Sequence, residues 1–342
     1  MSHLENVVWT ISHLCRGTPS PPTHVTAPVV SPLVALLDEP ISDEVREHCL
    51  WALSYLSDGD EQKLELVVAS GVAPKLVHLL QDDNFKGKCT IPVVRILGNF
   101  VLGNDRQTQF AIDSGILNHL PRLLGSRRKV IRKEASRFAS NVACGKHAQI
   151  TTLVNRKRVL RQIIKNATND VWEVRKEALR AVANICMSGY HTHVMSLVDA
   201  GGLEPLITVL KFGNIDPTLL LVILEALGKV LEVGGNLASQ NYVDVIEKYN
   251  GIDYLEELQT HPSEAVYNKV VELIENYLGT EDGDENLAPE TNESGTFNFG
   301  FAPKQLFPNI NATEQSSSDN ALPFGSISAN TFDAPTSTLY PV

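Results

Sequence analysis

The sequence repeats one pattern with a period of a little over forty residues, and this period restricts the fold more than any other feature. Each copy ends in an apolar, helix-like stretch that carries a marker residue and, four positions later, a polar or aromatic residue. We call each such pair a rung. The rungs are Trp9/His13, Trp51/Tyr55, Arg95/Asn99, Arg137/Asn141, Arg180/Asn184 and Glu225/Lys229. Successive rungs are 42, 44, 42, 43 and 45 residues apart, a spacing typical of helical repeat arrays.

A second phrase, a glycine followed by leucines at helical spacing, belongs to the same period. Its clearest copies are SGVAPKLVHLL from Ser70, SGILNHLPRLL from Ser114, AGGLEPLITVL from Ala200 and NGIDYLEEL from Asn250. One unit of two amphipathic helices cannot bury its apolar faces alone, so neighbouring units must stack around one continuous core. No segment shows the period-2 alternation of a half-buried strand. The sequence therefore predicts an all-α solenoid whose last helices line a concave groove.

The charge divides the chain into two regions. The whole chain has a net charge of −11, but the region after Leu278 holds nine acidic side chains against one basic residue, Lys304. We predict an array of about six to seven repeats over residues 1–278, the first incomplete, and a disordered acidic tail with spaced phenylalanines over residues 279–342. The array itself is nearly neutral, which argues against direct binding of nucleic acid.

The sequence contains no motif typical of an enzyme, a metal site or a membrane helix. The sequence has no phosphate-binding glycine loop, no nucleophile elbow and no H-E-x-x-H, so we predict no catalytic residues, no cofactor and no enzyme activity. The five cysteines are far apart, without a Cys-x-x-Cys pair, which favours neither a zinc site nor disulfides. We expect His191 and His193 to face solvent, not a metal. No uncharged apolar run approaches membrane-spanning length.

Five stretches of the array resemble importin α, the armadillo-repeat adaptor that carries proteins with basic nuclear-localisation signals. They are VVWTISHLCRG from Val7, HCLWALSYLSDG from His48, VRILGNFVLGNDRQTQ from Val94, RKEASRFASNVACG from Arg132 and WEVRKEALRAVANI from Trp172. The resemblance covers nearly the whole chain as far as Phe299. It implies a right-handed superhelical solenoid of armadillo repeats, and a protein that shuttles between cytoplasm and nucleus.

In importin α, tryptophans form slots for lysine and arginine stems, asparagines bind the peptide backbone and acidic residues receive the cationic groups. The resemblance places this cargo groove at Trp9, Trp51, Tyr55, Arg95, Asn99, Asp105, Thr108, Glu134, Arg137, Asn141, Glu177, Arg180 and Asn184. The family has tryptophan where this chain has Arg137 and Arg180, and asparagine where it has His13. Because a cation replaces an aromatic face at two rungs, we expect weaker binding of basic peptides there. Pairing of Arg137 with Glu134 and of Arg180 with Glu177 would offset that repulsion.

The resemblance also implies partners: proteins with basic import signals and the export receptor that returns importin α to the cytoplasm. The Phe-Gly pairs of the tail, at Phe299-Gly300 and Phe324-Gly325, resemble the repeats that line nuclear pores, which points to nucleoporins as a further class of partner. Candidate contacts for the export receptor are Tyr267, Asn268, Glu281 and Asp282. The chain begins inside what resembles the family's fourth repeat, without the basic importin β-binding segment. We therefore expect an N-terminally truncated or divergent member, whose binding to importin β is in question.

Two alternatives remain open at the level of sequence. In the first, the chain is an armadillo scaffold that no longer binds import signals and instead holds a partner, such as an acidic peptide, at Arg95, Arg137 and Arg180. In the second, it is a competitor that binds cargo and slows import.

Overall fold

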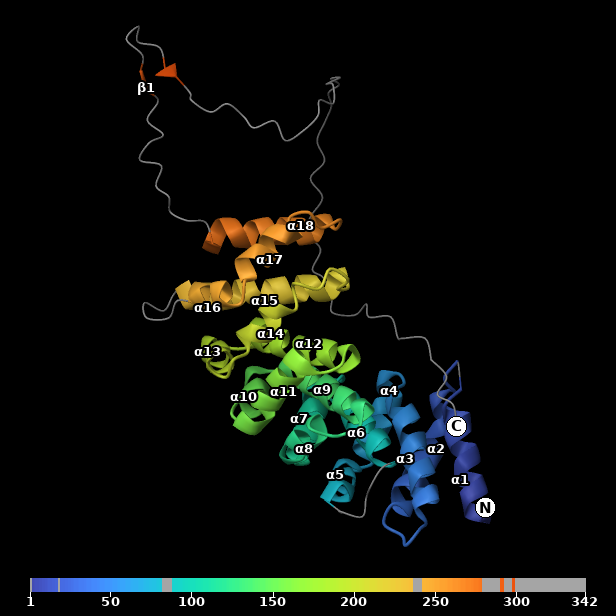
Figure 1. Ribbon diagram of the computed structural model, residues 1–342. Helices are drawn as coiled ribbons and strands as arrows, with labels where there is room; N and C mark the ends of the chain where they lie inside the picture. Colours follow the sequence, from blue (N-terminus) through green and yellow to red (C-terminus); the bar gives the residue numbers. More distant parts are fainter. Residues whose placement is uncertain are drawn as a thin grey trace, which may run out of the picture. The chain divides into compact units, whose positions relative to one another are not determined.

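The computed structural model describes residues 2–17, 19–81, 88–235 and 242–278, together with the backbone of residues 290–291 and 297–298 (Figure 1). The chain divides into two units, Met1–Thr280 and Glu281–Val342, and each is treated by itself. In the second unit, β1 (Glu290–Thr291) pairs antiparallel with β2 (Phe297–Asn298). The predicted disordered tail otherwise lies outside the described residues.

The first unit begins with α1, and its other α-helices follow one another in groups of two or three, two of which also include a short 3-10 or π-helical turn. They are α1 (His3–Cys15); α2 (Thr23–Leu36) and α3 (Asp43–Ser57); α4 (Glu61–Ala69), α5 (Ala73–Gln81) and α6 (Thr90–Phe100); α7 (Asp105–Asp113), η1 (Ile116–Asn118), α8 (Leu120–Leu124) and α9 (Lys129–Ala143); α10 (His147–Val154), α11 (Lys157–Asn169) and α12 (Trp172–Ser188); α13 (His191–Asp199), α14 (Leu203–Thr208) and α15 (Pro217–Gly235); and α16 (Tyr242–Lys248), α17 (Gly251–Leu258), α18 (Glu264–Leu273) and the π-helical turn η2 (Ile274–Leu278).

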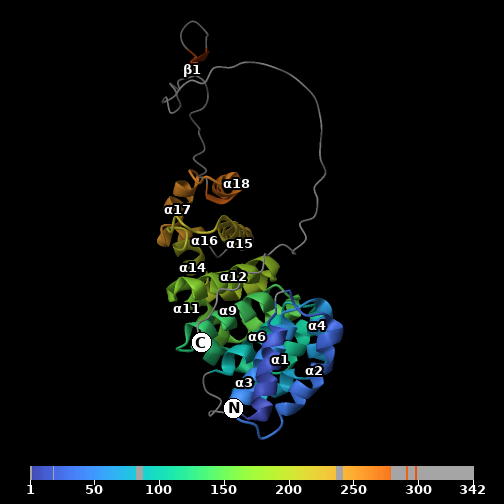
Figure 2. The ribbon, with the colours of Figure 1, turned by 90° about the vertical axis from the view of Figure 1, so that its right-hand side faces the viewer.

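The last helix of each group packs on the last helix of the next. α1 contacts α3, and the series continues through α6, α9, α12 and α15 to α18, as the two views at right angles also show (Figures 1 and 2). Each group therefore covers the apolar face of its neighbour, as expected for stacked repeats. The prediction of an all-α solenoid is confirmed.

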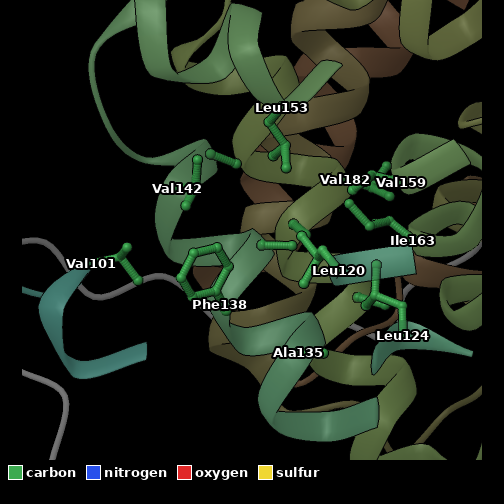
Figure 3. Packing of buried hydrophobic residues seen from close by; sticks show 14 of the residues in the cluster. Val101, Leu120, Leu124, Ala135, Phe138, Val142, Leu153, Val159, Ile163 and Val182 are labelled. Atoms are coloured by element: carbon green, nitrogen blue, oxygen red, sulfur yellow. The ribbon is translucent and has the colours of Figure 1, made fainter. Parts of the chain in front are cut away.

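The core follows this stack from one end of the first unit to the other. In α12 the predicted apolar stripe of Ala178, Val182 and Ile185 has no exposed surface, because residues three or four apart share one face of a helix. Figure 3 shows the centre of the core around Phe138 of α9, with Leu120 of α8 and Val142 in the same cluster. None of the helices that the structure describes is by itself long and apolar enough to cross a membrane; α4 and α5 reach that length and composition only together, bent by 65°.

A glycine turn connects successive groups and fixes where the next helix begins. Before α7, the backbone N–H of Asn104 donates to Gln107 Oε1 at 3.0 Å, and Gln107 N–H donates to Asn104 Oδ1 at 3.1 Å. A Cβ at the preceding Gly103 would lie 1.8 Å from Gln107 Oε1, so only glycine lets the glutamine close this capping box. Gly145 and Gln149 form the same turn before α10, where Lys146 N–H donates to Gln149 Oε1 at 3.0 Å.

The corresponding turn before α13 contains a histidine in place of glutamine. The backbone N–H of Tyr190 donates to His193 Nδ1 at 2.9 Å. Nε2 therefore carries the ring proton and donates to Thr151 Oγ1 at 2.8 Å. His193 is 5% exposed, so the expectation of a solvent-facing histidine pair is wrong for this residue, whereas His191 is exposed. Burial, and next the charge of His147, lower the pKa of His193 below its ordinary value.

We expect acid to weaken the array through His193. Because its pKa is lower in the folded than in the unfolded chain, its contribution to stability is complete above the unfolded value of about 6.5 and is lost as the pH falls below it. His193→Gln keeps the cap, since Gln107 and Gln149 occupy this position in the two preceding turns. The measurement is the melting temperature between about pH 7 and pH 5. The melting temperature of the variant should fall less over this pH range than that of the wild type. An equal fall in both proteins would contradict the assignment.

Candidate functional site

The rungs lie on the helices that stack on one another, one rung on each of α1, α3, α6, α9, α12 and α15. The two members of a rung are four residues apart, so they lie on the same face of their helix. Because these helices pack in series, the rungs follow one another along one surface of the first unit, which we call the rung face.

The rung face begins with aromatic side chains. The rings of Trp9 and His13 have centroids 4.1 Å apart, and Trp9 is 41% exposed. On α3, the rings of Trp51 and Tyr55 stack with centroids 5.7 Å apart. The Arg95 guanidinium of α6 lies 5.8 Å from the centre of the Trp51 ring. A chain cation therefore already uses this ring in the way that a lysine or arginine of a ligand would.

Carboxylates accompany these aromatic rungs. Arg95 Nη2 lies 3.4 Å from Asp58 Oδ2, just after α3. Asp58, Glu61, Asn99 and Asn104 line a cleft of about 330 Å³ between the ends of α3 and α6. Asp58 and Glu61 are not among the residues predicted from the sequence. The signal that could have found them is the acidic run S-D-G-D-E directly after a rung helix.

The rung face continues with arginines whose charges are balanced unequally. Arg180 Nη1 lies 3.3 Å from Glu177 Oε1, and the Glu177 side chain is 11% exposed. The expected pairing of Arg137 with Glu134 is not present: within the described ranges no ion pair involves either of these half-buried residues. Of the three rung arginines, Arg95 and Arg180 therefore have a carboxylate neighbour, and Arg137 has none within the described residues.

The rung asparagines contact the helix before their own. Asn99 Nδ2 donates to Ser57 Oγ at 2.9 Å and to the Ser54 carbonyl at 3.4 Å. Asn184 Nδ2 donates to Ser140 Oγ at 3.0 Å and to the Ser140 carbonyl at 3.1 Å.

Asn141 differs from these two asparagines. Its Nδ2 is buried without a hydrogen-bond partner among the described residues. Ser54 and Ser140 each directly precede a rung residue, and the residue at that place on α6, opposite Asn141, is Gly98. The Gly98 carbonyl does not accept a bond from Asn141 as the carbonyls of Ser54 and Ser140 do from Asn99 and Asn184, so the Asn141 amide keeps an unpaired donor within the described chain.

The remaining predicted residues are spread over the neighbouring helices. Asp105, at the start of α7, is exposed and lies 3.0 Å from Lys146 Nζ. Thr108 on α7 is 4% exposed, and Glu177 is 9% exposed. On α18, Tyr267 and Asn268 are both exposed. Glu281 and Asp282 lie outside the described residues.

The chain is similar in sequence to armadillo repeats and to importin α subunits. The family described as Armadillo/beta-catenin-like repeat matches residues 25–58, and the family described as Atypical Arm repeat matches residues 240–290. The chain is 34% identical to importin subunit alpha-1b of Oryza sativa subsp. japonica over 88% of its length. It is 36% identical to importin subunit alpha-4 of Arabidopsis thaliana over 89% of its length. It spans 56% and 57% of these two relatives, a little more than half of each.

Solved structures of designed armadillo repeat proteins have a similar fold. A designed armadillo repeat protein in complex with peptide (KR)4 aligns with a TM-score of 0.61 and 27% identity, covering 72% of this chain and 98% of the designed one. A computationally designed armadillo repeat protein for modular peptide recognition aligns with a TM-score of 0.63 and 26% identity, covering 72% and 99%.

Proposed function

Because the chain belongs to the importin α family of armadillo-repeat proteins, we propose that it is a nuclear import adaptor that binds basic nuclear-localisation-signal peptides along the rung face. The observation that carries the proposal is the register of the rungs, one on each stacked helix from α1 to α15. An extended peptide offers side chains at a regular spacing, and a periodic surface can engage them one after another. A relative in fold is known with a bound (KR)4 peptide.

The aromatic end of the rung face provides the main contacts in this proposal. Lysine or arginine stems pack between the indoles of Trp9 and Trp51, because long cationic side chains have apolar stems and aromatic faces attract cations. The ammonium or guanidinium groups then reach Asp58 and Glu61, which line the cleft beside Asn99. A ligand arginine competes there with Arg95, whose guanidinium lies near the Trp51 ring and Asp58 in the free protein.

The asparagines bind the peptide backbone. Asn141 is central, because its Nδ2 is without a partner among the described residues. A buried amide donor that is left unpaired costs about 1–3 kcal/mol, and a peptide carbonyl that accepts its hydrogen bond removes this cost. Asn99 and Asn184 keep their Oδ1 atoms for peptide N–H groups while their Nδ2 atoms bind serines of the preceding helix.

The far end of the rung face contributes less to basic peptides. Arg137 and Arg180 offer no aromatic wall, and Arg137 repels a cationic ligand. Asp105, Thr108, Glu134 and Glu177 surround this region and supply the polar contacts there. We further propose that the chain shuttles between cytoplasm and nucleus and that Tyr267 and Asn268 on α18 contact an export receptor, both side chains being exposed.

We expect the double variant Asn141→Ala/Asn184→Ala to bind a basic signal peptide about ten-fold more weakly than the wild type, because two backbone hydrogen bonds are worth roughly 1–2 kcal/mol together. Fluorescence anisotropy of a labelled peptide measures this. Asn118→Ala, at an exposed asparagine that ends η1, is the matched control.

The single variants separate binding from folding. Asn184→Ala also removes two bonds to Ser140 and should lower the melting temperature, whereas Asn141→Ala removes none that the described chain makes and should affect affinity alone. If the double variant binds like Asn118→Ala, the assignment of the rung face as the peptide site is wrong.

One observation favours a second candidate function, that of a scaffold for an acidic partner. Arg137 has no ion pair within the described residues and lies beside the unpaired amide of Asn141. A carboxylate-bearing peptide would satisfy both groups at once. Competition between an acidic and a basic peptide of equal length distinguishes the two functions, since the adaptor prefers the basic peptide and the scaffold prefers the acidic one.

A further inference from the structure

A second pocket, of about 370 Å³, lies where the loop before α12 meets the loop before α15. Its walls are Asp170, Trp172, Arg175, Phe212, Asn214 and Ile215, and none of these is a rung residue. Trp172 is 41% exposed and Phe212 is 44% exposed. Two large aromatic side chains around an open, mainly apolar hollow are unusual on a protein surface and point to an interaction site.

The same position one repeat earlier is closed by a salt bridge. Arg132 of α9 bonds Asp170 with two nitrogens: Nε lies 2.6 Å from Oδ2, and Nη2 lies 2.7 Å from Oδ1. The side chains of Arg132 and Asp170 are 19% and 9% exposed. Asp170 Oδ1 also accepts the backbone N–H of Val171 at 2.7 Å. This bidentate pair joins the α9 repeat to the next one and leaves Asp170 saturated.

The rung numbering shows what replaces this pair in the pocket. Arg132 lies five residues before the rung residue Arg137, and Arg175 lies five residues before Arg180. Asp170 lies ten residues before Arg180, and the residue ten before Glu225 is Ile215. Arg175 is therefore the counterpart of Arg132, and the place of its carboxylate partner is taken by an isoleucine.

The guanidinium of Arg175 is consequently short of partners. Its Nε donates to the Ala167 carbonyl at 2.8 Å, and its Cζ lies 5.0 Å from the centre of the Phe212 ring. Within the described chain no carboxylate lies within ion-pairing distance of Arg175. Lys211 Nζ approaches the same Phe212 ring at 5.2 Å, so two cations lie near this ring.

The acidic residues nearby are already engaged. Glu173 Oε1 is 3.1 Å from Lys129 Nζ, and Asp216 Oδ1 accepts the backbone N–H groups of Thr218 and Leu219 at 3.0 and 3.1 Å. The pocket therefore combines an apolar hollow with the positive charge of Arg175, and Lys211 lies beside it at Phe212; none of these carboxylates balances either charge.

We propose that this pocket is a docking site for an acidic peptide segment that carries an aromatic side chain. A carboxylate of the segment binds Arg175 in the place that Asp170 holds against Arg132. The adjacent aromatic ring packs between Trp172 and Phe212, and a second carboxylate lies near Lys211. Charge complementarity selects an acidic segment over a basic one, so this site and the rung face take ligands of opposite charge.

Two substitutions test the role of the Arg175 charge, one by pairing it and one by removing it. Ile215→Asp supplies the missing partner from within the protein, so Arg175 becomes paired as Arg132 is. Arg175→Gln removes the cation while keeping the length of the side chain. Arg106→Gln is the matched control, because it breaks an arginine–carboxylate pair between repeats, that of Arg106 with Glu65, and neither residue lines the pocket.

The experiment uses the full chain and a labelled peptide GEDFEDFEG, with anisotropy for binding and thermal melting for folding. Binding to the wild type, a loss of about ten-fold or more in both Arg175→Gln and Ile215→Asp, and unchanged affinity in Arg106→Gln support the proposal. Ile215 is 6% exposed, so thermal melting must show that Ile215→Asp is folded, and Arg175→Gln, at a half-buried side chain, tests the loss of binding independently.

Four results would overturn the proposal. They are no binding to the wild type, equal binding by Ile215→Asp, equal binding of the serine peptide GEDSEDSEG, and displacement by inorganic phosphate at the same concentration as by peptide. The last two would show an anion site without recognition of an aromatic segment. None of these results affects the proposed binding of basic peptides, which is measured with a different peptide at a different surface.

Discussion

Replacing Arg137 and Arg180 together by tryptophan will tighten the binding of a basic signal peptide by about one to two orders of magnitude. Each indole adds a cation–π contact worth about 0.5–2 kcal/mol, and 1.4 kcal/mol corresponds to a factor of about ten in affinity. Both arginines are half-buried on rung helices, so each new ring stands beside its neighbours in the series.

The two positions should contribute unequally. Arg180 lies 3.3 Å from Glu177, whose side chain is 11% exposed. Arg180→Trp therefore leaves a largely desolvated carboxylate without that cation, which lowers the stability of the free protein and gives a ligand lysine a strong partner. Arg137 has no such carboxylate in the described chain, so Arg137→Trp gains only from the ring and from the loss of repulsion.

A control separates the aromatic contribution from the charge. The variant Arg137→Gln/Arg180→Gln removes both cations without adding rings, and it should show a smaller gain than the tryptophan pair. Calorimetric titration at two salt concentrations measures both variants, because the gain from lost repulsion fades with salt and the gain from packed rings does not. Equal affinity of the glutamine and tryptophan variants would show that basic side chains do not reach these rungs.

The repeat and its register could be predicted from the sequence because they depend on local periodicity. Residues four apart share a helix face whatever surrounds them, so pairs such as Trp51/Tyr55 and Arg180/Asn184 were identified without a structure. The same holds for the buried stripe of α12, in which Ala178 and Val182 are four residues apart.

What could not be predicted depends on contacts between repeats about forty residues apart. The amide of Asn141 is unpaired among the described residues, whereas the amides of Asn99 and Asn184 bond the preceding rung helix. Glu177 neutralises Arg180, while Glu134 does not reach Arg137. His193 is buried because it caps a helix as Gln107 does. In each case the partner becomes known only when neighbouring helices are placed.

Phe138→Ala will lower the free energy of unfolding by about 3–5 kcal/mol, the range found when a buried phenylalanine is truncated to alanine. Phe138 is 1% exposed and lies on α9, which packs on both α6 and α12. Its ring lies in the cluster of Figure 3 beside Leu120, and the surrounding backbone belongs to helices held by neighbours on either side. The cavity can therefore collapse only in part. Phe212→Ala, the same truncation at a side chain that is 44% exposed, is the matched control and should cost far less.

The position of Phe138 in the stack also predicts how the variant unfolds. In a repeat array the stability is approximately a sum over repeats and the interfaces between neighbours. A cavity in α9 weakens the interfaces with α6 and α12 at the same time, so the array should divide there. Urea denaturation followed by tryptophan fluorescence reports on both sides, since Trp9 and Trp51 lie before α9 and Trp172 lies after it. We expect one transition in the wild type and a broadened or double transition in Phe138→Ala. A single transition at the wild-type midpoint would mean that α9 does not couple the two halves of the array, and that the rung face is not held in register through this helix.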